Sequence, residues 1–206
     1  RQVDWMPDSK GMYAYIEENG DGHLVSVDLQ GKVKRITGGI GGESFGRPYS
    51  GGSYSIAQNG RFVFTKSNTS SPAELAVGDL KAKEIRTITR LNDAFLASRS
   101  LGKVEEIWFE SSFDQKKIQG WAIFPPNFDP AQKCPLILEI HGGPYLSYGP
   151  HFTPELQLMA AKGFVVLYIN PRGSTSYGEE FASWINHNYP SEDYDDLMSG
   201  VDAMIA

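Results

Sequence analysis

The chain has 206 residues, and its 25 acidic and 19 basic side chains give it a formal net charge of −6. Hydrophobic residues make up 40% of the chain and aromatic residues 12%, which excludes a disordered chain and is typical of a packed core. No apolar run approaches the ~18 residues of a membrane span, the negative charge argues against a nucleic-acid binder, and the single cysteine excludes an internal disulfide.

The first half of the chain contains an internal repeat of short strands. Each copy has a polar turn with a glycine, followed by a strand with alternating large apolar side chains. The repeated pairs are Gly11 with Gly60, Asp28 with Asp79 and Thr37 with Thr89, separated by 49, 51 and 52 residues. A period of about 50 residues fits four-stranded β-propeller blades, each of which buries its faces only against its neighbours.

Two blades do not close a propeller, which typically has about 4–8, so we expect further blades before Arg1. The chain also lacks an initiator methionine, and it ends at 201–206 in a helical pattern without a Gly or Pro stop signal. We therefore expect the chain to be a piece of a longer protein.

The second half changes from strands alone to alternating strands and helices. Two strands, Val104–Glu110 and 118–124, flank a polar turn, and the run 135–140 is apolar on both faces, as in the middle of a parallel or mixed sheet. The further expected elements are a helix at 154–162, a strand at 164–170, a helix at 177–188 and a last helix with Ser191 at its N-cap. This order implies an α/β sheet with its site at the carboxyl ends of the strands.

The motif His141-Gly142-Gly143-Pro144 directly follows the apolar strand 135–140. Glycines let the backbone turn sharply and leave its N–H groups unshielded by a Cβ. Fixed N–H groups at such a strand exit form the oxyanion hole of hydrolases with a His-Gly-Gly motif, where one donor is worth about 2.7–4 kcal/mol. A plain tight turn is the alternative explanation of these residues taken alone.

Four motifs in the second half together resemble those of one enzyme family. They are Leu138-Glu139-Ile140-His141-Gly142-Gly143-Pro144, Tyr148-Gly149, Asn170-Pro171-Arg172-Gly173-Ser174-Thr175-Ser176-Tyr177-Gly178 and the stretch 193–202. They are similar to the prolyl oligopeptidase family of serine peptidases, especially its acylaminoacyl-peptidase and dipeptidyl-peptidase branches, in which a β-propeller precedes an α/β-hydrolase domain. The resemblance implies that Gly143, alone or with Gly142, gives a backbone N–H to the oxyanion hole, and that the amide after the catalytic serine is the second donor.

The predicted fold class is therefore β-propeller blades (all-β) followed by the N-terminal part of an α/β-hydrolase domain. We expect C-terminal blades of the propeller over 1–95, a connecting strand segment over 96–117 and the N-terminal part of the hydrolase (peptidase) domain over 118–206.

The Ser/Asp/His triad of such an enzyme is not found in this chain. A search for Gly-x-Ser-x-Gly finds Gly42-Glu43-Ser44-Phe45-Gly46, which we reject because an elbow serine leaves a buried strand and enters a helix. Ser44 instead follows a glycine-rich loop in the propeller half. Ser174 and Ser176 lack the spacing, and His141 comes before any nucleophile, whereas the order in these hydrolases is Ser, Asp, His. We expect all three triad residues after Ala206.

The other polar groups have structural explanations. We expect the side chain of His141 to hold the oxyanion turn, and Arg172 to form a buried ion pair with Asp195 or Asp196 rather than to bind a substrate. Charge at a helix N-terminus explains the acidic cluster at 192–196, so we predict neither a metal nor a cofactor. Surface, packing or ordinary thiol roles are assigned to His23, His151, His187 and Cys134.

The leading hypothesis is that the chain is part of a serine peptidase that hydrolyses short peptides through an acyl-enzyme. The parent protein is then a hydrolase, and this chain alone is inactive. Two alternatives stay open at this point: an esterase with the same oxyanion loop, and a non-catalytic propeller scaffold. The expected partner is a short peptide, without nucleic acid or membrane. A homo-oligomer is compatible with the sequence, and so is a cytoplasmic, periplasmic or secreted location.

Overall fold

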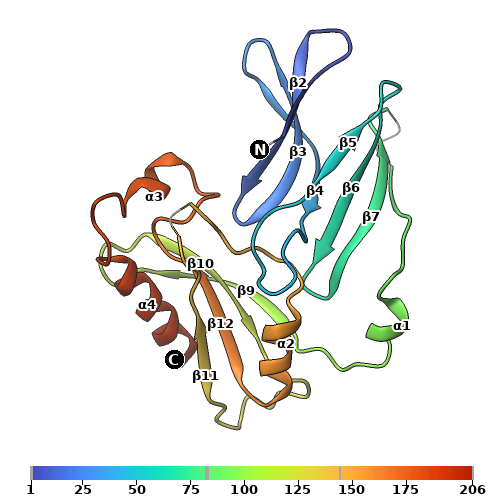
Figure 1. Cartoon of the computed structure of the whole chain (residues 1–206). Coiled ribbons are helices and arrows are strands. Elements are labelled where there is room, and N and C mark those ends of the chain that lie inside the picture. The colour runs from blue at the N-terminus through green and yellow to red at the C-terminus, as the bar shows by residue number, and fades with distance from the viewer. Residues whose placement is uncertain (1, 82–83, 144, 206) are drawn as a thin grey trace.

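The computed structural model describes residues 2–81, 84–143 and 145–205 (Figure 1). The first half forms two antiparallel four-stranded units. The first unit contains β1 (Val3–Trp5), β2 (Gly11–Glu18), β3 (Asp21–Asp28) and β4 (Val33–Ile40). The second contains β5 (Tyr54–Ile56), β6 (Arg61–Asn68), β7 (Ser71–Asp79) and β8 (Ile85–Thr87). These two units correspond to the two copies of the sequence repeat.

One residue pair, Ile40 with Lys66, joins β4 to β6. Through it, the described residues form one eight-stranded sheet in the order β1-β2-β3-β4-β6-β7-β8, with β5 paired to β6. The part of the chain that the structure describes holds no closed propeller.

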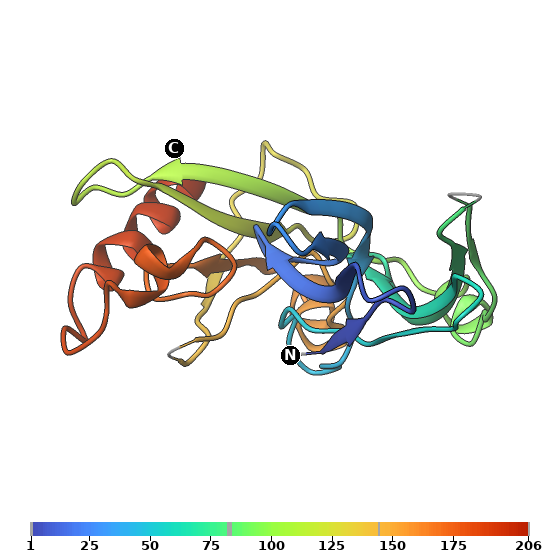
Figure 2. The same cartoon turned by 90° about the horizontal axis from the view of Figure 1, so that it is seen from above.

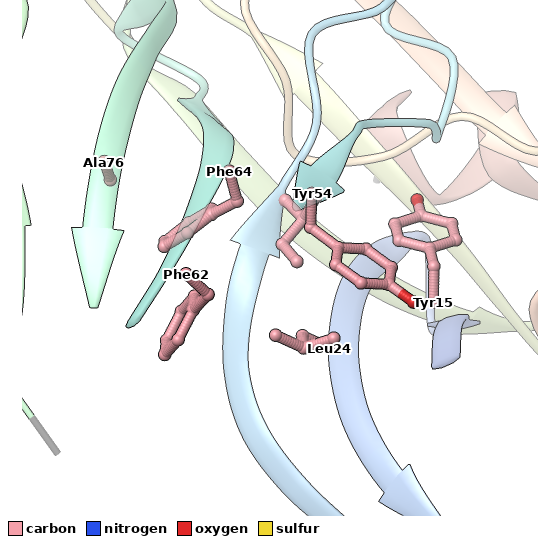
Figure 3. Close-up of a cluster of buried hydrophobic side chains, with 7 residues drawn as sticks. Tyr15, Leu24, Tyr54, Phe62, Phe64 and Ala76 are labelled. Atoms are coloured by element: carbon pink, nitrogen blue, oxygen red, sulfur yellow. The ribbon is translucent and has the colours of Figure 1, made fainter. Parts of the chain in front are cut away.

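The two units share one hydrophobic core, which Figure 3 shows. Alternation along the strands creates it: in β6, Phe62 and Phe64 are buried while Arg61 is exposed, because successive side chains of a strand point to opposite faces. The members of the core are Tyr15, Leu24, Ile40, Tyr54, Phe62, Phe64 and Ala76, contributed by six strands. Because both units contribute side chains, one copy of the repeat alone could not form this core.

The second half contains a mixed four-stranded sheet. Its strands are β9 (Val104–Glu110), β10 (Lys117–Ile123), β11 (Leu136–Glu139) and β12 (Val165–Asn170), in the spatial order β11-β12-β10-β9. The helices are α2 (Pro154–Ala161), α3 (Glu179–Ser183) and α4 (Asp193–Ile205), with α1 (Asp93–Leu96) in the connection from the first half. In the view from above, α3 and α4 lie at the opposite end of the molecule from α1 and β7 (Figure 2).

Helices cover both faces of this second sheet. Val166 and Tyr168 of β12 pack with Leu156 of α2 on one face, and Leu167 and Ile169 pack with α3 and α4 on the other. All six residues of β12 are therefore buried, as expected for a strand that is apolar on both faces.

Two sequence-based predictions near the C-terminus differ from the structure. The helix expected at 177–188 is shorter, because α3 ends at Ser183 and His187 adopts a φ of 55°, outside the helical region. The N-cap prediction for Ser191 is wrong. Its hydroxyl donates to the carbonyl of Asn188 at 2.5 Å, and its N–H donates to the Asp193 carboxylate at 2.6 Å.

The two halves meet along a junction that includes backbone hydrogen bonds between two short segments. The segment 46–50, between β4 and β5, runs antiparallel to 147–149. The N–H of Ser50 donates to the carbonyl of Ser147 at 2.8 Å, and the N–H of Gly149 donates to the carbonyl of Pro48 at 2.7 Å. A second contact joins the β2–β3 turn to the second half, where the N–H of Gly20 donates to Ser176 Oγ at 2.7 Å.

Glycines make this close approach possible. A Cβ added at Gly149 would lie 2.1 Å from the carbonyl oxygen of Gly20 and 3.0 Å from the ring of His151. His151 is itself buried beside Gly41 at the junction, and burial lowers its pKa to about 4. The ring is therefore neutral at physiological pH.

We predict that Gly149→Ala destabilises the junction, because the new methyl group overlaps a backbone atom that cannot move aside. The expected loss in the free energy of unfolding is about 1–3 kcal/mol. Gly46→Ala is the matched control in the same junction, since a Cβ there meets nothing within 4 Å. Urea unfolding of both variants measures the difference, and equal stabilities would contradict the proposed packing.

Candidate functional site

Two strand exits meet at one edge of the second sheet. β11 and β12 are parallel, with Glu139 opposite Tyr168, so their carboxyl ends lie side by side. The motif at 141–143 follows β11, and the motif beginning at Asn170 ends β12 and continues into the next loop. Polar groups from both motifs therefore converge, as in other open α/β sheets.

The backbone N–H groups of Gly142 and Gly143 are available for a ligand. Both residues are exposed, and no described residue accepts a hydrogen bond from either amide. They border a cavity of about 510 Å³ that is also lined by His141, Arg172, Ser174 and Leu197. A Cβ at Gly142 would meet nothing within 4 Å, so open space adjoins the loop. The last residue of the sequence motif, Pro144, lies outside the described residues.

The side chain of His141 connects the two strand exits. Its Nδ1 lies 2.9 Å from the carbonyl oxygen of Gly142, and its Nε2 lies 3.1 Å from Ser174 Oγ. Burial lowers the pKa of His141 below its usual value, which favours the neutral ring. In that form Nδ1–H donates to the carbonyl of Gly142. Ser174 Oγ lies beside Nε2 and donates its own proton to the carbonyl of Pro171 at 2.6 Å.

Arg172 is buried and fully engaged by carboxylates. Its Nε donates to Asp196 Oδ2 at 2.8 Å and its Nη2 to Asp196 Oδ1 at 2.7 Å, while Nη2 also lies 3.1 Å from Asp114 Oδ1. Of the two carboxylates considered from the sequence, the partner is Asp196, because Asp196, Leu197 and Gly200 share the buried face of α4. The hydrogen bonds that Arg172 donates to Asp196, opposed by burial, raise the pKa of Arg172. The guanidinium is thus a structural group between β12 and α4.

One residue of the first half reaches the end of β11. Arg47, in the segment 46–50, forms ion pairs with Glu139 at the end of β11 and with Glu155 in the first turn of α2. The hydroxyl of Tyr148 lies 3.3 Å from the same Glu139 carboxylate. No local sequence pattern points to Arg47, because its partners lie about 90 and 110 residues away.

Asn170 is a second residue of this site that was not predicted as a site residue, although it begins the motif 170–178. It is fully buried at the end of β12 and bonds the backbone of Tyr148. The available signal was a lone amide at the end of an otherwise apolar strand, because a buried carboxamide is normally hydrogen-bonded.

Of the remaining candidates, His187 also lines this cavity, whereas Ser44 and Ser176 lie away from it. Ser44 lies in the irregular segment between β4 and β5, and Ser176 contacts the β2–β3 turn. Within residues 2–81, 84–143 and 145–205, no group of three or more His, Cys, Asp or Glu side chains is arranged to hold a metal ion. Among the same residues, no helix is long and apolar enough to cross a membrane.

We predict that Asp196→Asn lowers the free energy of unfolding by about 3 kcal/mol, because it leaves the buried Arg172 without its main counter-charge. Asp114 remains close, which keeps the loss at the lower end of the usual range. Asp195→Asn is the control on the same helix, because its carboxylate makes no contact with Arg172. Equal losses for the two variants in chemical denaturation would show that the pair is not a structural link.

Comparison with known proteins gives consistent matches. Residues 150–206 match the model of the prolyl oligopeptidase family. The chain is 33% identical over 202 residues to an uncharacterised peptidase, YuxL, of Bacillus subtilis, covering 98% of this chain and 29% of that protein. It is 27% identical over 205 residues to dipeptidyl-peptidase 5 of Porphyromonas gingivalis, covering 98% and 28%.

The fold is also that of a solved relative. An acylaminoacyl peptidase in complex with Z-Gly-Gly-Phe-chloromethyl ketone matches with a TM-score of 0.81 and 27% identity, over 100% of this chain and 30% of that one. The chain thus spans about 30% of the length of the proteins it matches. Its two antiparallel units are propeller strands, and its mixed sheet is the first part of an α/β-hydrolase domain. The chain is thus similar over nearly its whole length to peptidases, and its residues 150–206 match the prolyl oligopeptidase family.

Proposed function

We propose that this chain carries the oxyanion side of a serine peptidase active site. The single observation that carries the proposal is the pair of exposed, unpaired N–H groups of Gly142 and Gly143 beside a cavity at the exits of two parallel strands. Among the basic side chains beside Gly142 and Gly143, Arg172 is paired with Asp196, and burial lowers the pKa of His141, which disfavours its charged form. We therefore take the backbone N–H groups of Gly142 and Gly143 as the donors to a developing negative charge.

In the proposed reaction, a serine outside this chain attacks the carbonyl carbon of the scissile peptide bond. A histidine takes the serine proton and later gives it to the leaving amine, and an aspartate orients that histidine. The carbonyl oxygen becomes an oxyanion, which accepts a hydrogen bond from Gly143, with Gly142 beside it. Collapse of this intermediate gives an acyl-enzyme, which water then hydrolyses.

The topology supports a nucleophile from a later segment. Among the described residues, β11 pairs with β12 on one side only, and its side chains are half-buried whereas those of β12 are fully buried. A further parallel strand added at this edge would end beside 141–143, and a serine at its end would face Gly143. We place the triad after Ala206 for this reason, and we expect the chain alone to be inactive.

The proposed substrates are short peptides, because propeller strands precede the hydrolase sheet and would restrict access. The names of the relatives, dipeptidyl-peptidase 5 and acylaminoacyl peptidase, point to the same class of substrate. The proposed domain division is propeller blades over 1–95, a connecting segment over 96–117 and the hydrolase part over 118–206. The connecting segment includes β9, which is hydrogen-bonded to β10 and begins the second sheet.

We predict that Gly143→Pro in the full-length protein lowers kcat for a peptidyl nitroanilide by about 10²–10³, because proline removes the N–H that binds the oxyanion. Gly143→Ala is the matched control. It keeps the N–H, and its Cβ meets only the Tyr145 nitrogen, at 3.7 Å.

Three outcomes would count against the proposal. Equal activity of the two variants would remove Gly143 from the reaction. Turnover of p-nitrophenyl esters without turnover of aminoacyl or acyl-aminoacyl nitroanilides would favour an esterase. A full-length protein that a fluorophosphonate does not label would favour a non-catalytic scaffold.

A further inference from the structure

The side chain of Asn170, the last residue of β12, forms hydrogen bonds with the backbone of Tyr148. Its Oδ1 accepts from the N–H of Tyr148 at 2.7 Å, and its Nδ2 donates to the carbonyl of Tyr148 at 2.8 Å. In an extended segment the N–H and C=O of one residue point to the same side, so one carboxamide can satisfy both. The asparagine thus fixes the Tyr148 backbone in position and orientation.

A row of hydrogen-bonded side chains satisfies the second N–H of this carboxamide. Nδ2 of Asn170 also donates to the hydroxyl of Tyr177 at 2.7 Å, and that hydroxyl donates to Gln119 Oε1 at 2.5 Å. Gln119 Nε2 in turn donates to Glu106 Oε1 at 2.8 Å. Each of these hydrogen bonds has a donor facing an acceptor. The Tyr148 backbone fixes the orientation of the amide, because a flipped amide at Asn170 would place Nδ2 against the Tyr148 N–H and lose both bonds to the backbone.

Tyr148 in turn ends the loop that begins at His141. Its fully buried ring packs edge-on against the ring of His141, with centroids 4.8 Å apart. At the start of the loop, His141 contacts Ser174. Both ends of the segment 141–148 are therefore attached to residues at the exit of β12, and the exposed glycines lie between the two attachments.

We propose that Asn170 is a positioning residue for the oxyanion loop, which sets the direction of the Gly142 and Gly143 N–H groups through the Tyr148 backbone. The inference rests on the proposed peptidase function and deepens it. Asn170 touches no substrate, so its loss displaces donors that act on the tetrahedral intermediate. A misplacement of about 1 Å at such donors can cost about 100-fold in rate.

The test compares Asn170→Asp with Tyr177→Phe in the full-length protein. The aspartate has nearly the same shape but has no donor for the Tyr148 carbonyl when ionised. The phenylalanine removes another hydrogen bond of the same carboxamide and leaves both bonds to Tyr148. We expect Asn170→Asp to lower kcat for a peptidyl nitroanilide about 100-fold with KM changed less than about threefold, and Tyr177→Phe to keep kcat within about threefold.

Inhibitor binding separates positioning from a general structural role. A peptidyl trifluoromethyl ketone forms a charged adduct in the oxyanion hole, so Asn170→Asp should weaken its binding by the same factor as kcat/KM. Binding of the corresponding peptide amide, whose carbonyl oxygen is uncharged, should stay nearly unchanged. Equal weakening of both ligands, or normal kcat in Asn170→Asp, would overturn the inference.

Hydrogen exchange keeps the inference testable apart from the proposed function. If Asn170 holds the loop, Asn170→Asp should speed exchange of the amides of 141–149 about tenfold or more, and Tyr177→Phe should not. Unchanged exchange would contradict the positioning role even in an active enzyme. Conversely, if Asn170→Asp speeds exchange but the full-length protein hydrolyses no peptide, the peptidase proposal is contradicted and the positioning role of Asn170 is not. If Asn170→Asp does not fold, Asn170→Ser, whose hydroxyl is too short to reach the Tyr148 backbone, replaces it in each measurement.

Discussion

The structure depends on how three consecutive residues, 147–149, use their backbone groups. In an extended chain, successive residues direct their hydrogen-bonding groups to opposite sides. Ser147 and Gly149 therefore bond the propeller segment 46–50 on one side, while Tyr148 bonds Asn170 of the hydrolase sheet on the other. The same short segment joins the two halves and ends the loop 141–148, in which we propose the oxyanion donors. Displacement of the propeller strands and displacement of the loop are thus coupled through one peptide segment.

Charges around this segment strengthen the same connection. Arg47 from the propeller half pairs with Glu139, which immediately precedes the loop, and Tyr148 contacts that carboxylate through its hydroxyl. At the far side of the sheet, Arg172 ties the exit of β12 to α4 through Asp196. Arg47 and Arg172 near the loop are held in structural ion pairs, and no described residue accepts a hydrogen bond from the N–H groups of Gly142 and Gly143 beside the cavity. This division suits a site that must stabilise a transient negative charge without binding anions permanently.

Sequence analysis predicted most of the strands, because alternation and glycine turns are local signals. The strand before His141 and the α/β order followed from apolar runs such as 135–140 and Val165–Asn170, although β11 is only half-buried in the structure. The link between Asn170 and Tyr148 could not be predicted in this way, because the two residues are 22 positions apart and only the parallel register brings them together. The choice of Asp196 over Asp195 likewise depends on which face of α4 packs on the sheet. The helix expected at 177–188 failed because composition did not reveal the left-handed backbone at His187.

The most direct test of the central claim is the structure of the full-length protein with a peptidyl boronic acid or chloromethyl ketone bound at its serine. We predict that an oxygen of the adduct lies about 2.7–3.1 Å from the backbone nitrogen of Gly143, with both hydrogen bonds between Asn170 and Tyr148 intact. An adduct oxygen that points away from 141–143 and is held by other groups would contradict the account.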